Sequence, residues 1–213
     1  DQVYKIIHAA KIPTPFIYVG HSLGGNIGEM YHAKYPQDIA ALALIEPGYP
    51  KFMIEGSEYK GTRQQALALR DCDWKCPVAL AAAHLGLPRL AAPIALAHST
   101  LRSDIKAQYL AGLGRPATVV GLVAVLYNVP KSAFQIDDIK SFGDTPVITF
   151  ASARPTEPEK GETEAHYQAG LTDERDYLTA LAAKSTRGTG VVVIPGSNHG
   201  NMVIGETQSG LTA

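Results

Sequence analysis

Short apolar runs alternate with helical patterns at both ends of the chain. Near the N-terminus, the strand-like runs Phe16–Val19 and Ala40–Ile45 are separated by a helical pattern. Near the C-terminus, Val147–Phe150 and Val191–Ile194 enclose a helical pattern from Asp173 to Lys184. This alternation predicts an α/β fold with a doubly wound, mostly parallel sheet.

Two boundaries refine this prediction. Residues 1–10 repeat apolar side chains at Val3, Ile6, Ile7 and Ala10, which predicts an amphipathic helix that packs on the sheet. The helix after the first strand is expected to end at Tyr35–Pro36, because proline cannot continue a helix.

The middle of the chain has a different pattern. Helical segments rich in alanine and leucine, separated by glycine and proline, are Arg63–Leu69, Cys76–Leu85, Pro93–Leu101, Ile105–Leu113 and Pro116–Leu126. We therefore predict three parts: a first core part over residues 1–50, an inserted helical cap over 51–142, and a second core part over 143–213. The cap's composition favours an apolar pocket floor.

The first strand leads into a motif that can carry chemistry. Gly20-His21-Ser22-Leu23-Gly24 fits G-x-S-x-G, the nucleophile elbow, in which a serine occupies a sharp turn between strand and helix. We expect a side chain at Gly20 or Gly24 to collide with neighbouring backbone. The helix that begins after Ser22 points free N–H groups at any negative charge that develops there. A glycine-rich turn without chemistry is the alternative interpretation.

The last predicted strand ends in Pro195-Gly196-Ser197-Asn198-His199-Gly200. This turn places His199 just past the carboxyl end of a parallel strand, where catalytic groups gather in open α/β sheets. The other six histidines lie in the elbow or in helical and cap segments. Among them, His21 is interpreted as a packing and hydrogen-bonding residue.

Composition narrows the function classes. The chain of 213 residues is 46% hydrophobic and 18% charged, with a net charge of −1, which is typical of a globular protein and gives no sign of a nucleic-acid partner. The apolar runs fall short of the ~20 residues that a membrane helix needs, so no transmembrane span is expected. Cys72 and Cys76 lack further ligands at zinc spacing, so no metal site is expected, and whether they form a disulfide stays open.

These motifs and their order resemble the alpha/beta-hydrolase superfamily. Tyr18–Gly25, the stop at Tyr35–Pro36 and the run Leu42–Pro47 look like its capped serine esterase and lipase branch. The resemblance implies that Ser22 is the nucleophile, that His199 is the general base, and that the Leu23 backbone N–H is an oxyanion donor.

The triad acid departs from the family's commonest pattern. The loop after Val147–Phe150 offers no aspartate, although Glu157 follows a little later. Glu46, at the end of the strand after the elbow helix, occupies the other position that the superfamily uses. Glu46 is the preferred acid and Glu157 the alternative, while a glutamate that only caps a turn remains a third interpretation.

The second departure from the family's pattern concerns the length of the chain. Members of the superfamily carry several strands before the elbow, one of whose loops supplies a second oxyanion donor, and a final helix after the histidine. We therefore expect N-terminal strands of a longer protein to be missing from this sequence. The compartment and the oligomeric state stay open.

The expected function is that of a serine hydrolase. It would cleave a carboxylic ester, or a related acyl bond, of a small, partly apolar substrate through an acyl-enzyme on Ser22, without a cofactor. The rival hypothesis is a non-catalytic ligand-binding or interaction protein that keeps the elbow as scaffold. Exchange of Ser22 for alanine separates the two, because only an enzyme would lose turnover.

Overall fold

The computed structural model describes residues 2–56, 59–69, 75–90, 102–113, 115–153 and 163–204. They divide into two compact units, each treated separately below. The first unit contains the N-terminal segment up to Phe52 and the segment from Gln135 to Val203, and the second contains the described residues from Met53 to Phe134.

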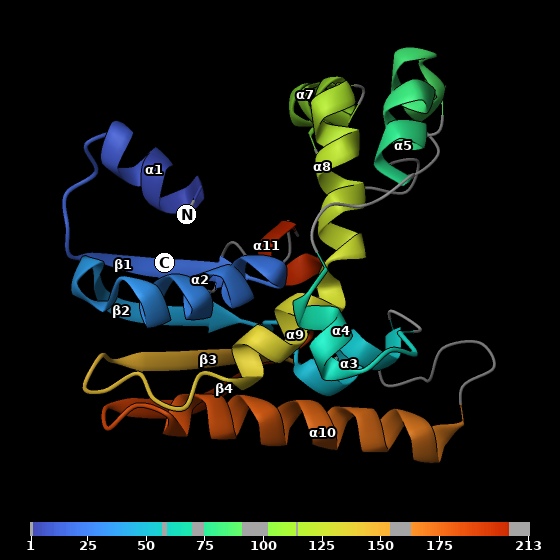
Figure 1. The fold of residues 1–213 in the computed structure, drawn as a ribbon. Helices are drawn as coiled ribbons and strands as arrows, with labels where there is room; N and C mark the ends of the chain where they lie inside the picture. Colours follow the sequence, from blue (N-terminus) through green and yellow to red (C-terminus); the bar gives the residue numbers. More distant parts are fainter. Residues whose placement is uncertain are drawn as a thin grey trace. The chain divides into compact units, whose positions relative to one another are not determined.

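The first unit is built on four parallel strands, β1 (Phe16–His21), β2 (Ile39–Ile45), β3 (Val147–Ser152) and β4 (Gly188–Ile194), in the order β1-β2-β3-β4 (Figure 1). The helix α2 (Leu23–Lys34) packs on β1 and β2, and α10 (Glu164–Ala183) packs on β3 and β4. The predicted parallel sheet is thus confirmed. Because the strands are parallel, their carboxyl ends meet at one edge, and the turns that follow β1, β2 and β4 lie there together.

The core of this unit lies between the sheet and its helices. Leu42 and Leu44 of β2 are fully buried, whereas Ala41 and Ala43, on the other face of the strand, are half-buried. Tyr177 of α10 contacts Glu29 of α2, so both helices lie on the same face of the sheet.

On the opposite face the edge strand β1 exposes Ile17 and Val19, with 67% and 62% of their surface accessible. Tyr18 points the other way, against Gly28 of α2. The apolar run Phe16–Val19 therefore has one face buried by α2 and one face open to solvent.

The helix α10 is longer than the sequence pattern predicted. It begins at Glu164 rather than near Asp173, because Thr163 caps it by accepting a hydrogen bond from the His166 N–H at 3.2 Å. The polar first half of this helix and the glycine at position 170 hide the helical pattern.

The N-terminal helix α1 (Gln2–Ala9) also differs from expectation. The sequence predicts that an apolar face of this helix packs on the sheet. In the structure, however, Ile6 is 65% exposed, and Ile7 is the buried residue of α1. Instead Tyr4 stacks on Tyr35, just after α2, with ring centroids 4.2 Å apart. His8 contacts Asp38 at 3.2 Å, in the short 3-10 helix η1 (Pro36–Asp38). Aromatic stacking and this polar pair hold α1.

The elements described in the second unit are helices. They are most of α3 (Pro50–Gly56), then α4 (Arg63–Leu67), α5 (Lys75–His84), α7 (Ser103–Leu113), α8 (Pro116–Tyr127) and most of α9 (Val129–Asp137). The helix α5 packs along α8. The sequence pattern missed α3 and α9, and the predicted helix Pro93–Leu101 lies outside the described residues. Whether these helices act as a cap stays a prediction.

Two further sequence questions concern this unit. Cys76 is disulfide-bonded, and Cys72 lies outside the described residues. Across the described ranges, no single helix is long and apolar enough to cross a membrane, although Ser103–Gly112 and Pro116–Tyr127 would pass that test together, bent by 76° at their junction.

Candidate active site

The turn after β1 holds Ser22 in an unusual backbone conformation. Its φ of 54° and ψ of −126° lie outside the regions that non-glycine residues favour, and Ser22 directly precedes the first residue of α2. The Ser22 N–H donates to the Ile45 carbonyl at 2.9 Å, which ties the turn to the end of β2. This is the strand-turn-helix setting that the elbow motif requires.

The glycines around Ser22 differ in how much space a side chain would have at each of them. A Cβ at Gly20 would lie 2.5 Å from the Gly24 carbonyl oxygen, as predicted. A Cβ at Gly24 would meet nothing within 4 Å, so the predicted collision there is wrong. The crowded partner is Gly25, where a Cβ would lie 2.8 Å from Cβ of Pro47. Gly24 is uncrowded because its Cβ direction points out of the β1–α2 contact, whereas Gly25 faces the turn after β2.

Three segments that are distant in sequence bring Ser22, His199 and Glu46 into one hydrogen-bonded chain. Ser22 Oγ lies 3.0 Å from His199 Nε2, and His199 Nδ1 lies 2.7 Å from Glu46 Oε2. With its proton on Nδ1, the imidazole donates to Glu46 and accepts from the Ser22 hydroxyl. In this arrangement the histidine can take the serine proton while a carboxylate orients it.

Glu46 is buried beneath His199, whose side chain remains about half exposed. Its other oxygen, Oε1, accepts a hydrogen bond from the Ser152 N–H at the end of β3, at 2.5 Å. Burial opposes ionisation, but the hydrogen bonds from His199 and Ser152 outweigh it and lower the pKa of Glu46 below its ordinary value. The alternative acid, Glu157, lies outside the described residues.

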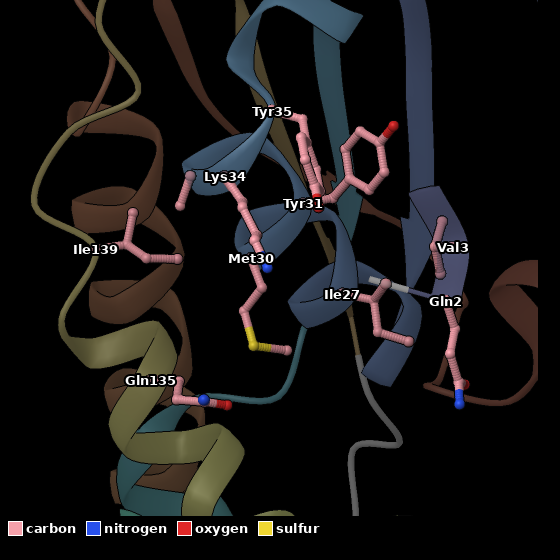
Figure 2. Close-up of a pocket in the computed structure, with 10 residues that line it drawn as sticks. Gln2, Val3, Ile27, Met30, Tyr31, Lys34, Tyr35, Gln135 and Ile139 are labelled. Carbon is pink, nitrogen blue, oxygen red and sulfur yellow. The ribbon is translucent and has the colours of Figure 1, made fainter. Parts of the chain in front are cut away.

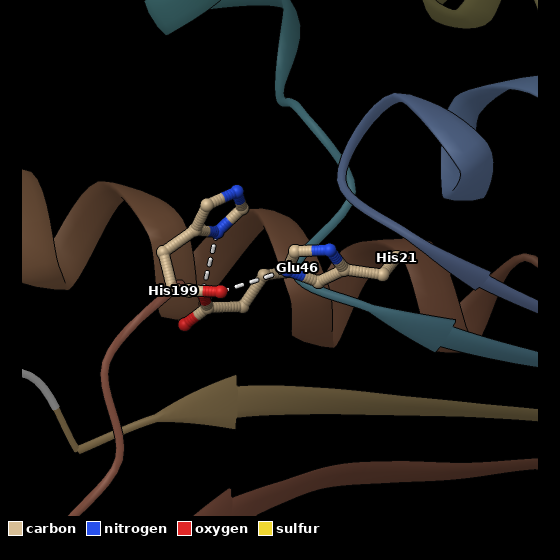
Figure 3. Close-up of side chains that lie close together, drawn as sticks. All are labelled: His21, Glu46 and His199. Carbon is tan, nitrogen blue, oxygen red and sulfur yellow. Dashed lines mark hydrogen bonds and ion pairs between the residues drawn. The ribbon is translucent and has the colours of Figure 1, made fainter. Parts of the chain in front are cut away.

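His21 reaches the same cluster from the other side. Its Nε2 donates to the backbone carbonyl of His199 at 2.9 Å, and the two rings are 4.5 Å apart (Figure 3). Burial, and then the proximity of His199, lower the pKa of His21, so its neutral form is favoured. His21 thus ties the histidine turn to the elbow.

The same cluster offers a set of potential metal ligands. One ligand atom each from His21, Glu46 and His199 lies within 4.8 Å of the others. Because Glu46 and His199 are hydrogen-bonded to each other, an ion here would compete with that contact.

The start of α2 supplies the candidate oxyanion donor. Leu23 is the first residue of the helix, and its N–H has no acceptor among the described residues. It follows Ser22 directly, at the positive end of the helix dipole. A negative oxygen that develops on a carbon bonded to Ser22 Oγ would therefore lie beside a free donor.

Sequence reasoning missed the residues that join the turns. The buried Ser197 Oγ donates to the Ile194 carbonyl at 2.5 Å and accepts from the Ala153 N–H at 3.3 Å, so it links the turns after β3 and β4. Asn26 of α2 links to the turn after β2 at Gly48. Their sequence signal is weak, since Ser197 is one of the small polar residues that are common in turns, and Asn26 lies inside a helix.

The first unit also has a pocket of about 500 Å³ away from these residues. Figure 2 shows its lining from α1, α2 and the segment around α9, with Val3, Ile27, Met30 and Ile139 as apolar walls and Lys34 nearby. Neither Ser22 nor Glu46 nor His199 lines it. The pocket is therefore separate from the candidate active site.

A family model matches the first part of the chain. Residues 1–75, which include the elbow and Glu46, match the alpha/beta hydrolase fold family. A search of curated proteins found no significant match to this sequence. Together with the parallel sheet and the elbow, this match supports the alpha/beta hydrolase fold for the chain.

Solved structures show the same fold at low sequence identity. They include a carboxylesterase from the thaumarchaeon Nitrososphaera gargenis, with a TM-score of 0.52, 16% identity, and coverage of 100% of this chain and 66% of that one. A haloalkane dehalogenase from Bradyrhizobium elkanii gives a TM-score of 0.55 and 14% identity, covering 99% and 71%. A haloalkane dehalogenase from Agrobacterium tumefaciens gives 0.53 and 13%, covering 99% and 69%. The chain spans about two thirds of the length of such proteins.

Proposed function

We propose that this chain carries the active site of a serine hydrolase that cleaves a carboxylic ester of a small, partly apolar substrate. The observation that carries the proposal is the hydrogen-bonded chain from Ser22 Oγ through His199 to Glu46. Ser22 is the nucleophile, His199 the general base and Glu46 the acid, and the Leu23 N–H is one oxyanion donor.

The proposed reaction has two halves. Ser22 Oγ attacks the ester carbonyl carbon while His199 Nε2 takes the hydroxyl proton, and the carbonyl oxygen becomes an oxyanion beside the Leu23 N–H. The C–O bond then breaks, the alkoxide leaves with the proton from His199, and the acyl group stays on Ser22. Water, deprotonated by His199, attacks the acyl carbon, and the acid leaves as His199 returns the proton to Ser22 Oγ. One backbone donor of this kind lowers the barrier by about 3 kcal/mol, and the Glu46 carboxylate stabilises the imidazolium.

The nucleophile limits the class of bond. Haloalkane dehalogenases and epoxide hydrolases of this fold use a carboxylate nucleophile, and this chain has Ser22 at that position. Esters, thioesters, amides and lactones are all open to a serine nucleophile, and of these we propose a carboxylic ester. The alanine- and leucine-rich composition of residues 51–142 is the reason for proposing an apolar acyl or alcohol group.

A fluorophosphonate probe tests the proposal without knowledge of the substrate. We expect the folded chain to form a covalent adduct on Ser22, located by mass spectrometry of peptides. The Ser22→Ala variant and heat-denatured chain are the controls, and both should remain unlabelled. A folded chain that gives no adduct on Ser22 would contradict the proposal and favour the rival, a non-catalytic binding protein on the same scaffold.

A further inference from the structure

Asn26 and Gly48 form a reciprocal pair between the elbow helix and the turn that follows Glu46. Asn26 Nδ2 donates to the Gly48 carbonyl at 2.7 Å, and the Gly48 N–H donates to Asn26 Oδ1 at 3.1 Å. The side-chain amide thus satisfies both backbone groups of Gly48 in the way that a neighbouring peptide would. Asn26 lies one helical turn after Ser22, and Gly48 lies two residues after Glu46.

Glu29 fixes the orientation of that amide from the buried side. Asn26 Nδ2 also donates to Glu29 Oε1 at 3.2 Å, and Glu29 Oε2 accepts from the Tyr177 hydroxyl of α10 at 3.4 Å. Glu29 has no exposed surface. The charge that acts on it is that of Lys184, directly after α10, and Asp137 acts in turn on Tyr177 and Lys184. Both hydrogens of Asn26 Nδ2 are therefore used, which leaves the amide one orientation.

Glu46 needs support on both sides because its backbone is strained. Its φ is 41°, a left-handed conformation that disfavours side chains other than glycine. On the strand side, the Glu46 N–H donates to the Phe150 carbonyl at 3.0 Å. On the other side the chain passes through Pro47, packed against Gly25, to Gly48, where Asn26 holds it.

We propose that Asn26 is a positioning residue that holds the Glu46 carboxylate against His199 by fixing Gly48 to the elbow helix. The inference rests on the proposed function for its catalytic consequence. Its structural consequence, the hydrogen bond from His199 Nδ1 to Glu46, can be measured without catalysis. When the Gly48 carbonyl loses its donor, the turn is free to relax and Glu46 moves out of line with His199.

The test is the nearly isosteric variant Asn26→Asp, which removes both donors and adds a negative charge beside Glu29. We expect fluorophosphonate labelling of Ser22 to slow by about tenfold or more, as for a buried hydrogen-bonding group left unpaired. In the proton NMR spectrum, the downfield Nδ1–H resonance of His199, assigned by its loss in Glu46→Gln, should also disappear.

Two variants separate positioning from general loss of folding. The double variant Asn26→Asp with Glu29→Gln removes the facing negative charge, so it should regain thermal stability yet still label slowly. Asn128→Asp is the matched control, because Asn128 makes an amide hydrogen bond to Ala124 in α8, far along the sequence. It should label at the wild-type rate.

The outcomes are distinct. Slow labelling together with the lost resonance supports the inference, whereas wild-type labelling with the resonance retained in Asn26→Asp overturns it. If the wild-type chain is not labelled but Asn26→Asp loses the resonance, the proposed function fails and the positioning role stands. If the resonance is unchanged in Asn26→Asp, the positioning role is wrong whatever the wild-type chain does.

Discussion

At the scale of single residues, the site combines an exposed histidine with two buried acids in different states. Hydrogen bonds keep the pKa of Glu46 low, so it is a carboxylate that can stabilise a charged His199. Glu29 is buried in the same unit, but desolvation dominates there, and it raises the pKa of Glu29 to about 7 despite Lys184 and the hydrogen bonds from Asn26 and Tyr177. Two donors reach each carboxylate, but those of Glu46 lie 2.7 and 2.5 Å away, whereas those of Glu29 lie 3.2 and 3.4 Å away.

The raised pKa of Glu29 predicts a pH dependence of stability. The folded chain binds this proton more tightly than the unfolded chain, whose value is 4.5, so the contribution to stability is present below pH 4.5 and is lost as pH rises towards 7. In Glu29→Gln, the free energy of unfolding should therefore fall less between pH 5 and pH 8 than in the wild type, by up to about 3 kcal/mol. Urea unfolding at several pH values measures this.

The control for that experiment is Glu164→Gln, which neutralises an exposed glutamate in the first turn of α10. Its pH dependence should follow that of the wild type. If Glu29→Gln follows it as well, the raised pKa of Glu29 is refuted.

At the scale of elements, the packing of β1 against α2 depends on the space at Gly20. A Cβ there would lie 2.5 Å from the Gly24 carbonyl oxygen, which belongs to the backbone and cannot rotate away. The same carbonyl accepts a hydrogen bond from the Tyr18 hydroxyl at 2.9 Å. The elbow is thus fixed by backbone crowding on one side and by a tyrosine on the other.

Gly20→Ala should lower the free energy of unfolding by about 1 to 3 kcal/mol, because the elbow helix must move away from β1. It should also slow probe labelling of Ser22. Gly24→Ala is the matched control, since its Cβ meets nothing within 4 Å and alanine favours the helix. It should leave stability unchanged or raised. Equal destabilisation by both variants in denaturant unfolding would contradict this account of the elbow.

At the scale of the whole molecule, the described residues leave one apolar face of strand β1 uncovered. Ile17 and Val19 are about two thirds exposed, while Tyr18 between them packs on α2. Apolar surface on an exposed sheet edge favours association with other chains. The described helices α2 and α10 do not cover this face of the sheet, so its apolar side chains can associate with other chains.

The double variant Ile17→Thr with Val19→Thr should reduce self-association of the chain, measured by light scattering after size-exclusion chromatography. Threonine keeps the strand preference, so the free energy of unfolding should change by less than about 1 kcal/mol. Tyr18→Thr is the control on the opposite face, and it should destabilise the chain clearly. Unchanged association in the double variant would show that this face is not responsible.

Local sequence patterns determined the strands, the elbow and the helix that follows it. Periodicity and glycine spacing act over a few residues, so Phe16–Gly24 and the position of His199 at a strand end could be predicted from the sequence. The start of α10 could not, because its first half is polar and depends on the cap at Thr163. Nor could the space at Gly24, since crowding depends on the direction of a Cβ relative to other segments.

Only the tertiary structure decided how the site is assembled. The sequence left the acid open between Glu46 and Glu157, because a carboxylate at either strand end could reach the histidine. The parallel order of β2, β3 and β4 places Glu46 between the Ser152 N–H and His199. The link from Asn26 to Gly48 likewise joins residues 22 positions apart. Such contacts follow from strand order and burial, which no local pattern encodes.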